Sequence, residues 1–189
     1  MTVARLFTLL VFLWVASEFG IWLFRRSKSG RSTGQFSVSN LVLWGLVGVS
    51  LCAAFLARRL SWAHIGGSSQ SLLFVAIVVL LVGIAIRWWA IVALGRFFTS
   101  DLAVQAGHRI VQTGPYRWVR HPSYTGLLVA FLGAGLAMYN WVSVVGMLAP
   151  VTAAIVYRVH VEEKMLEREF GTAYAEYRER TCRLLPGIF

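Results

Sequence analysis

Three long apolar runs occupy the first half of the chain: Val3–Phe24, Val38–Ala57 and Leu72–Leu94. A helix that crosses the hydrocarbon core of a bilayer needs about 20 mostly apolar residues, and each run is long enough. The composition agrees, because 58% of the residues are hydrophobic and only 14% are charged, whereas soluble domains carry about 25% charged residues. The chain is therefore predicted to be an integral membrane protein, and a soluble globular or a disordered protein is excluded.

The first and third runs contain charged residues. Arg5 and Glu18 interrupt the first run, which is too long for the apolar core of a signal peptide. Arg87 precedes the Trp88-Trp89 pair near the end of the third run. Tryptophans gather at membrane interfaces, and long cationic side chains extend toward the headgroups. We therefore expect Arg87 to reach the interface beside an aromatic belt.

The second half of the chain alternates between polar and apolar segments. Residues 95–125 are polar and rich in Gly and Pro, and they precede two shorter apolar runs, Leu127–Met138 and Val142–Tyr157. Two short runs around a tight turn predict a helical hairpin that need not cross the membrane completely. The polar tail begins at Arg158. Its apolar side chains are spaced for one helical face and are Leu166, Phe170, Tyr174 and Tyr177.

The Lys and Arg residues divide unequally between the two ends of such a bundle. Apart from Arg87, 14 lie in residues 25–37, residues 95–125 and the tail, whereas 3 lie on the other side, namely Arg5, Arg58 and Arg59. The excess of positive charge marks the cytoplasmic side. We therefore expect the N-terminus outside, and the polar loop and the C-terminus in the cytoplasm, with the protein in the cytoplasmic (inner) membrane.

These patterns predict an all-α integral membrane protein with about five transmembrane segments, the last two a short hairpin. Residues 1–94 would supply three transmembrane helices, and residues 95–189 a cytoplasmic loop, the hairpin and a C-terminal helix, all in one domain. The net charge of +10 is interpreted as membrane orientation and attraction to anionic lipids, not as nucleic-acid binding. No metal site is expected, since the four histidines do not pair at helical spacing within a span. The oligomeric state is not predicted.

One polar cluster leads into the first apolar run of the hairpin. Pro122 suits the first turn of a helix, because it has no N–H and a fixed φ. The following backbone N–H groups would then point outward beside Arg120 and His121. This arrangement favours an anion site at the membrane surface. A helix start anchored to lipid phosphates is an equally good interpretation.

A second cluster opens the tail. Arg158 and Glu162 are four residues apart, so they share one face of a helix. They form either a simple ion pair or a clamp, in which the arginine holds an anion and the glutamate holds a hydroxyl or an amine. Glu163 points about 100° away, and we expect it to be solvated or paired with Lys164 or Arg168.

Three ordered motifs carry a resemblance to a known family. They read H-R-I-V-x-x-G-P-Y-R-x-x-R-H-P-S-Y-T-G from residue 108, E-E-x-x-L-x-x-x-F-G-x-x-Y-x-x-Y from residue 162, and R-L-L-P from residue 183. Over about residues 95–186 the chain resembles the isoprenylcysteine carboxyl methyltransferase family. This family belongs to a wider group of membrane methyltransferases that includes phospholipid N-methyltransferases. The chain looks like the shorter, five-segment prokaryotic form.

The resemblance implies S-adenosylmethionine as the methyl donor, bound without a Rossmann domain and released as S-adenosylhomocysteine. It implies that Arg158 faces a substrate carboxylate and positions it. It also implies cofactor contacts from the polar loop, the start of the hairpin and the tail: Gln105 (a weaker match), His108, Arg109, Ile110, Val111, Tyr116, His121, Pro122, Ser123, Tyr124 and Glu162.

The predicted function is therefore a carboxyl O-methyltransferase that acts on a lipophilic carboxylate, such as a prenylcysteine, at the cytoplasmic membrane face. A carboxylate is already ionised at neutral pH, so the site needs positioning rather than a strong base. Three alternatives stay open: a lipid-amine N-methyltransferase of the same superfamily, a non-catalytic membrane protein whose basic face binds anionic lipid or a partner, and a haem-binding redox protein. Nucleic acid is not an expected partner.

Overall fold

The computed structural model describes residues 2–24, 34–57, 59–66, 69–97 and 110–185 of the 189-residue chain. The described residues form α-helices and short 3₁₀ turns and no extended strand. The helices are α1 (Val3–Phe24), α2 (Gly34–Ala57), α3 (Ser69–Leu94), α4 (Pro122–Leu136), α5 (Trp141–Phe170) and α6 (Thr172–Glu179), and the 3₁₀ turns are η1 (Ser61–Ala63), η2 (Gly95–Phe97) and η3 (Gly114–Arg117).

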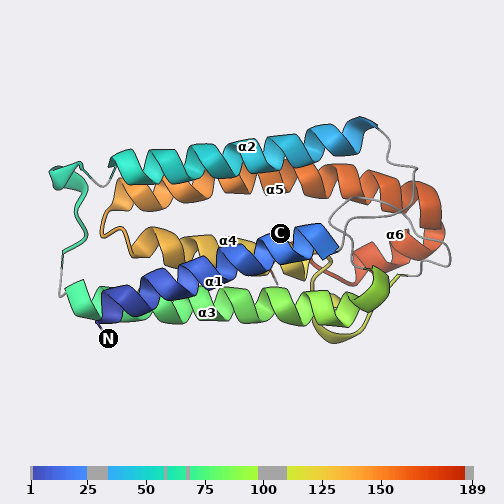
Figure 1. The fold of residues 1–189 in the computed structure, drawn as a ribbon. Helices are drawn as coiled ribbons and strands as arrows, with labels where there is room; N and C mark the ends of the chain where they lie inside the picture. Colours follow the sequence, from blue (N-terminus) through green and yellow to red (C-terminus); the bar gives the residue numbers. More distant parts are fainter. Residues whose placement is uncertain (1, 25–33, 58, 67–68, 98–109, 186–189) are drawn as a thin grey trace.

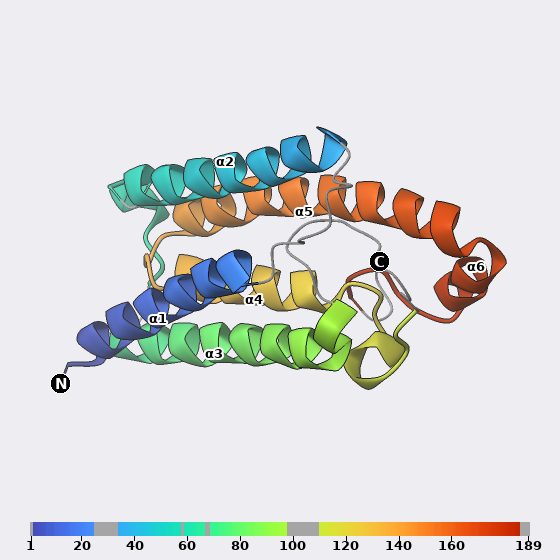
Figure 2. The ribbon, with the colours of Figure 1, turned by 45° about the vertical axis from the view of Figure 1, so that its right-hand side comes forward.

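Helices α1 to α5 form a bundle of two pairs with α1 laid across one of them (Figures 1 and 2). Helix α3 packs on α4 and α2 packs on α5, and the smaller contact between α4 and α5 joins the pairs. The end of α3, the start of α4 and the end of α5 lie at the same end of the bundle, where α6 also lies (Figure 1). The described polar residues next to these helix ends are therefore brought together.

Helix α5 corrects the expected short hairpin. It runs for 30 residues without a break through Arg158, whereas the apolar run was expected to end at Tyr157. Its polar last third is helical, so hydropathy located the end of the apolar stretch and not the end of the helix. Helix α4 is short, with 15 residues from Pro122. Helices α1, α3 and α5 are long and apolar enough to cross a membrane, and α2 and α4 contain shorter apolar stretches.

The expected single apolar face of the tail is also wrong. Helix α5 ends at Phe170, and Gly171 adopts a φ of 52° before α6 begins at Thr172. Glycine takes up this left-handed conformation without the steric cost that a side chain would bring. Tyr174 and Tyr177 therefore lie on a separate helix that turns back toward the bundle, and both are buried.

Glycines allow α3 and α4 to approach closely. A Cβ atom on Gly126 would lie 2.5 Å from the backbone nitrogen of Arg87, and one on Gly133 would lie 2.5 Å from the backbone nitrogen of Leu80. These distances are shorter than real Cβ contacts, so the two backbones touch at these positions. Small residues let helices pack in this way when lipid offers no hydrophobic driving force.

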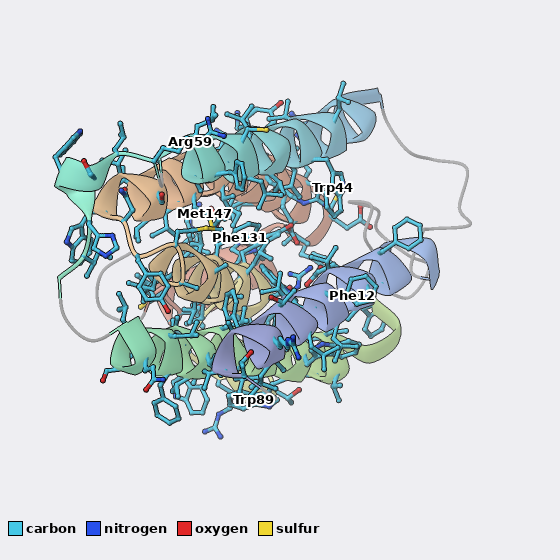
Figure 3. All side chains as sticks on the ribbon, turned by 60° about the vertical axis from the view of Figure 1, so that its left-hand side comes forward. Phe12, Trp44, Arg59, Trp89, Phe131 and Met147 are labelled. Atoms are coloured by element: carbon cyan, nitrogen blue, oxygen red, sulfur yellow. The ribbon has the colours of Figure 1, made fainter. Side chains whose placement is uncertain are left out.

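Side chains between the two pairs are buried and those on the outside are not (Figure 3). Phe131 and Met147 lie in the middle of the bundle, with 6% and 1% of their surface exposed. Phe12, Trp44 and Trp89 point outward and are about half exposed or more. An apolar exterior of this kind suits lipid contact, which agrees with an integral membrane protein.

Arg87 does not extend to the interface as expected. Its side chain is only 11% exposed and pairs with Glu18 of α1, whose side chain is 15% exposed. The neighbouring tryptophans do face outward, since Trp88 and Trp89 are both exposed. Trp89 also lies beside Trp118, with ring centroids 6.3 Å apart. The two tryptophans are therefore exposed, as an aromatic belt requires, while the arginine is turned into the bundle.

Candidate active site

The loop before α4 is folded onto α6. Gly114 has a φ of 59° and begins η3, which buries Pro115 and Tyr116. The hydroxyl of Tyr177 donates a 2.8 Å hydrogen bond to the carbonyl oxygen of Tyr116. Helix α4 then starts at Pro122, as its missing N–H predicts, and His121 occupies the N-cap position.

Helix α5 supplies the opposite wall. Arg158 lies 17 residues after Trp141, where the helix begins, which places it about 26 Å along the axis. That distance is close to the thickness of the hydrocarbon core. Arg158 is 5% exposed and Glu163 is 4% exposed, whereas the side chain of Glu162 is 25% exposed.

A hydrogen-bonded chain links the two helices. The hydroxyl of Tyr124 accepts a 2.7 Å hydrogen bond from Nε of Arg158. The same hydroxyl donates a 3.1 Å hydrogen bond to Oε2 of Glu162. Arg158 and Glu162 thus share one helical face, as their spacing predicted, and Tyr124 connects them.

His121 lies between the two neighbouring glutamates. Its Nδ1 is 3.8 Å from Oε2 of Glu162, and its Nε2 is 3.5 Å from Oε1 of Glu163. The ring stacks on Tyr124, with centroids 5.9 Å apart. It is buried, and Nε2 makes no hydrogen bond of good geometry to the described residues. The imidazole therefore has a defined position and an incomplete set of partners.

Glu163 is not solvated, contrary to our expectation. Its Oε1 accepts a 2.9 Å hydrogen bond from Nε of Arg120, and its Oε2 lies 2.9 Å from Nη2 of Arg183. Nη1 of Arg120 also donates to the carbonyl oxygens of Arg178 and Thr181. Arg120 thus uses these nitrogens to hold the tail, which favours a structural task over the anion site inferred from its sequence position.

Residues 181–185 run beside the loop before α4. Backbone N–H groups of Arg120 and His121 donate to the carbonyl oxygens of Cys182 and Arg183, at 2.8 and 3.1 Å. Val119 and Cys182 form an isolated parallel bridge. The tail is therefore a part of the site's wall, and the terminal R-L-L-P motif was the sequence signal for it.

Two buried tyrosines near the candidate site, Tyr116 and Tyr177, lie outside the apolar spans. Burial is the main cause that raises the pKa of Tyr116, and the nearby carboxylate of Glu162 adds to it. Burial raises the pKa of Tyr177 to about 12, partly offset by the positive charge of Arg120. Both hydroxyls therefore stay protonated at physiological pH and can serve as hydrogen-bond donors.

The structure brings together most of the residues singled out in the sequence. Arg158, Glu162 and Tyr124 are directly linked, and His121 and Tyr116 flank them. Pro122 and Ser123 are buried at the start of α4, and Ile110 and Val111 are partly buried before η3. Gln105, His108 and Arg109 lie outside the described residues. Sequence reasoning missed Glu163, Arg183 and Tyr177, whose partners are distant in the chain.

The comparisons with known proteins identify a family for the chain. Residues 75–168 match the model of the isoprenylcysteine carboxyl methyltransferase (ICMT) family. The segment contains α4 and most of α5, and with them Tyr124, Arg158 and Glu162. The chain belongs to the isoprenylcysteine carboxyl methyltransferase family.

Named relatives match about three fifths of the chain. The chain is 35% identical over 114 residues to protein-S-isoprenylcysteine O-methyltransferase A of Arabidopsis thaliana, covering 59% of this chain and 58% of that protein. It is 32% identical over 117 residues to a probable protein-S-isoprenylcysteine O-methyltransferase of Oryza sativa subsp. indica, covering 61% of each. The chain thus spans about three fifths of the length of these relatives.

A solved structure of the family has a similar fold. It is described as the eukaryotic intramembrane Ras methyltransferase ICMT without a monobody. It aligns with a TM-score of 0.53 and 23% identity, covering 82% of this chain and 53% of that chain. At this identity the likeness concerns the fold alone. It agrees with the arrangement of helices described above.

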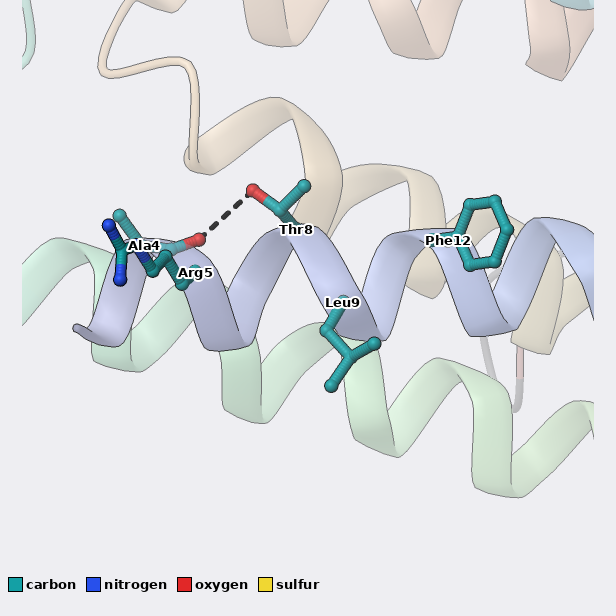
Figure 4. A pocket seen from close by; sticks show the side chains of 5 residues that line it. All are labelled: Ala4, Arg5, Thr8, Leu9 and Phe12. Carbon is teal, nitrogen blue, oxygen red and sulfur yellow. Dashed lines mark hydrogen bonds between the residues drawn. The ribbon is translucent and has the colours of Figure 1, made fainter. Parts of the chain in front are cut away.

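A surface hollow lies away from the site, near the start of α1. It is lined by apolar and polar side chains of one helix, namely Ala4, Arg5, Thr8, Leu9 and Phe12 (Figure 4). The hydroxyl of Thr8 donates to the carbonyl oxygen of Ala4 at 3.0 Å, so it is already satisfied. The start of α1 is at the opposite end of the bundle from α6 (Figure 1). This hollow contributes nothing to the polar cluster.

Proposed function

We propose that this chain is an S-adenosylmethionine-dependent carboxyl O-methyltransferase that acts on a lipophilic carboxylate, such as a prenylcysteine, at the cytoplasmic face of a membrane. The observation that carries the proposal is the hydrogen-bonded chain Arg158–Tyr124–Glu162. It sets a guanidinium and a partly exposed carboxylate side by side at the end of an apolar bundle. The names of the relatives support the same reaction.

In this proposal, Arg158 binds the carboxylate of the substrate. A guanidinium holds a carboxylate through two parallel N–H bonds, which fixes its plane as well as its distance. The bond from Nε to Tyr124 orients the guanidinium before any substrate arrives. The carboxylate is ionised at neutral pH and needs no general base, so orientation is the main contribution required of the protein.

Glu162 fits the ammonium group of the cofactor. Its Oε2 is used by Tyr124, while Oε1 has no hydrogen bond or ion pair among the described residues, and the side chain is 25% exposed. A carboxylate with an accessible oxygen beside a neutral tyrosine suits a cationic ligand. When bound, S-adenosylmethionine would supply an electrophilic methyl group on a sulfonium sulfur.

The other proposed cofactor contacts come from the loop before α4 and from the start of α4. His121 has an Nε2 atom that lacks a well-formed hydrogen bond, and Tyr116 and Ser123 are also buried. We propose that these residues hold the ligand together with Pro122, Ile110 and Val111. Gln105, His108 and Arg109 belong to the same proposal through the family motif.

The proposed topology has five spans, α1 to α5, with the loop before α4 and the tail in the cytoplasm. The positive charge gathered at that end supports this orientation. A lipid tail would enter from the bilayer, and the polar cofactor would enter from the water. One domain would combine residues 1–94 as transmembrane helices and residues 95–189 as the catalytic region.

The test is calorimetric titration of S-adenosylhomocysteine into the detergent-purified protein, with the Glu162→Ala, Arg158→Ala and Glu167→Gln variants. We expect saturable binding in the wild type and a loss of about 10–100-fold in Glu162→Ala, as for a hydrogen bond to a charged group. Arg158→Ala should keep the affinity for S-adenosylhomocysteine and lose methyl transfer to a prenylcysteine acid. Glu167→Gln is the matched control, because Glu167 is exposed and pairs with Arg178.

Other outcomes would point elsewhere. A folded wild type without saturable binding would reject the methyltransferase and favour a membrane protein that binds anionic lipid. Transfer to a lipid amine, with none to a carboxylate, would favour the N-methyltransferase. Arg158 argues against that second reaction, since a guanidinium is a poor neighbour for a cationic amine.

A further inference from the structure

A second polar cluster lies inside the apolar bundle, outside the candidate site. The carboxylate of Glu18 on α1 accepts hydrogen bonds from Nε and Nη2 of Arg87 on α3. Both side chains are largely buried, at 15% and 11% exposure. Both helices are long and apolar enough to cross a membrane. Ionisable residues at membrane depth are costly, so a pair placed there is by default a candidate for a functional role.

The remaining nitrogen of Arg87 reaches α4. Nη1 donates a 2.9 Å hydrogen bond to the hydroxyl of Ser123 and a 3.2 Å hydrogen bond to its carbonyl oxygen. One guanidinium therefore joins three helices, with the carboxylate on one side and the first turn of α4 on the other. Ser123 is the second residue of α4, between His121 and Tyr124.

The three helices meet at the end of the bundle that carries the candidate site. Glu18 is six residues from the end of α1, and Arg87 is seven residues from the end of α3. Close backbone packing fixes α3 against α4 at this level, because Gly126 touches the backbone of Arg87. The hydrogen bonds from Arg87 to Ser123 also require a fixed orientation of the guanidinium. The carboxylate of Glu18 fixes that orientation through two parallel hydrogen bonds.

We propose that Glu18 is a positioning residue for the methyltransferase site. It orients Arg87, which holds the first turn of α4 so that His121 and Tyr124 face Glu162 and Arg158. This inference rests on the proposed function, and it adds a residue of α1 that lies outside the family-matched segment 75–168.

The test compares loss of the Glu18–Arg87 ion pair with loss of an apolar contact of α1. Glu18→Gln removes the charge and keeps the shape. Arg87→Lys keeps a positive charge for Glu18 but lacks the planar fork needed to bind Glu18 and Ser123 together. Trp14→Leu is the matched control: Trp14 is buried on α1 against Phe131 of α4, and its Nε1 has no hydrogen-bond partner among the described residues. Thermal unfolding and the affinity for S-adenosylhomocysteine are measured for each.

All three variants should unfold at a lower temperature than the wild type. Glu18→Gln and Arg87→Lys should also weaken the binding of S-adenosylhomocysteine about tenfold or more, because small displacements of positioned side chains greatly reduce their interactions with a ligand. Trp14→Leu should leave the affinity within about twofold. Equal losses of affinity in Trp14→Leu and Glu18→Gln, or unchanged affinity in Glu18→Gln, would overturn the proposal.

A readout without any ligand separates this inference from the proposed function. The ring nitrogens of His121 are observed by ¹⁵N NMR of the histidine-labelled protein and assigned with His121→Gln. Glu18→Gln should shift both nitrogen resonances, because the distances from His121 to the two glutamates change, and Trp14→Leu should not. Resonances that stay in place in Glu18→Gln would refute the inference even where the wild type binds S-adenosylhomocysteine. Shifted resonances would support the link from Glu18 to His121 even where the wild type does not bind S-adenosylhomocysteine.

Discussion

Glu162 and Glu163 are neighbours in sequence with opposite surroundings. Glu162 is partly exposed and keeps one carboxylate oxygen without a partner among the described residues. Glu163 is buried, and both of its oxygens are engaged by Arg120 and Arg183. The first carboxylate is therefore suited to a ligand, and the second is suited to holding the tail against α5.

This difference predicts the effect of Glu163→Gln. The amide keeps the shape but leaves Arg120, whose side chain is only 8% exposed, without its counter-charge. Removing one member of a buried pair costs about 3–5 kcal/mol. We expect a loss of this order in the free energy of unfolding, measured by chemical unfolding in detergent.

The exposed pair Glu167–Arg178 provides the comparison for Glu163→Gln. Its side chains are 42% and 49% exposed, and exposed pairs contribute about 0–1 kcal/mol. Glu167→Gln should therefore be nearly neutral. Similar losses in Glu163→Gln and Glu167→Gln would contradict the structural role assigned to Glu163.

The sequence could not locate Glu163 correctly because its partners come from elsewhere in the chain. A helical wheel places it about 100° from Glu162, and in an isolated helix that face meets solvent. In the protein, Arg120 and the tail cover that face. The same limit explains Arg87, whose partner Glu18 is 69 residues away. Arg158 and Glu162 were predictable because their spacing and the family resemblance both single them out, whereas Tyr124 came from the family motif alone.

At the scale of helices, α3 and α4 are held by contact between their backbones. Gly133→Ala would set a Cβ atom 2.5 Å from the backbone nitrogen of Leu80, so the helices would have to separate. Overpacking of this kind costs about 1–3 kcal/mol. We expect a lower unfolding temperature and weaker binding of S-adenosylhomocysteine, since α4 carries Tyr124.

Gly48→Ala is the control for this contact. Gly48 lies on α2, and a Cβ there would meet nothing within 4 Å. The substitution should leave the unfolding temperature unchanged or raise it slightly, because alanine favours a helix more than glycine does. A Gly133→Ala protein as stable as Gly48→Ala would mean that α3 and α4 do not touch as described.

Helix boundaries were predictable where hydropathy and helix coincide. The first run was expected over Val3–Phe24, and α1 has these bounds. Helix α5 was predicted too short because Arg158, Glu162 and Glu163 end the apolar run while the backbone continues as a helix to Phe170. Hydropathy reports transfer into lipid, and a helix that extends beyond the lipid gives no signal there.

At the scale of the whole molecule, one end holds buried tyrosines outside the apolar spans. Tyr116, Tyr174 and Tyr177 have pKa values raised above the usual 10.0, with burial as the largest cause, and for Tyr177 the value is about 12. A raised pKa in the folded state means that the unfolded chain loses these protons more readily. The stability that these neutral hydroxyls contribute is thus fully present below pH 10.

We therefore expect the unfolding temperature to fall as the pH rises from about 10 to about 12. Tyr177→Phe should reduce this slope, because one of the titrating groups is gone. It should also lower stability at neutral pH by about 1 kcal/mol, since its hydrogen bond to Tyr116 is lost. An unchanged alkaline slope in Tyr177→Phe would show that this hydroxyl does not contribute.

The pairing of α3 with α4 and of α2 with α5 has a mechanical consequence. Tyr124 and His121 belong to the first pair, and Arg158 and Glu162 belong to the second. The two hydrogen bonds of the Tyr124 hydroxyl therefore join the pairs. A change in the lateral pressure of the bilayer that tilts one pair against the other would therefore act on the hydrogen bonds of the Tyr124 hydroxyl and on the contact of Arg120 with Glu163.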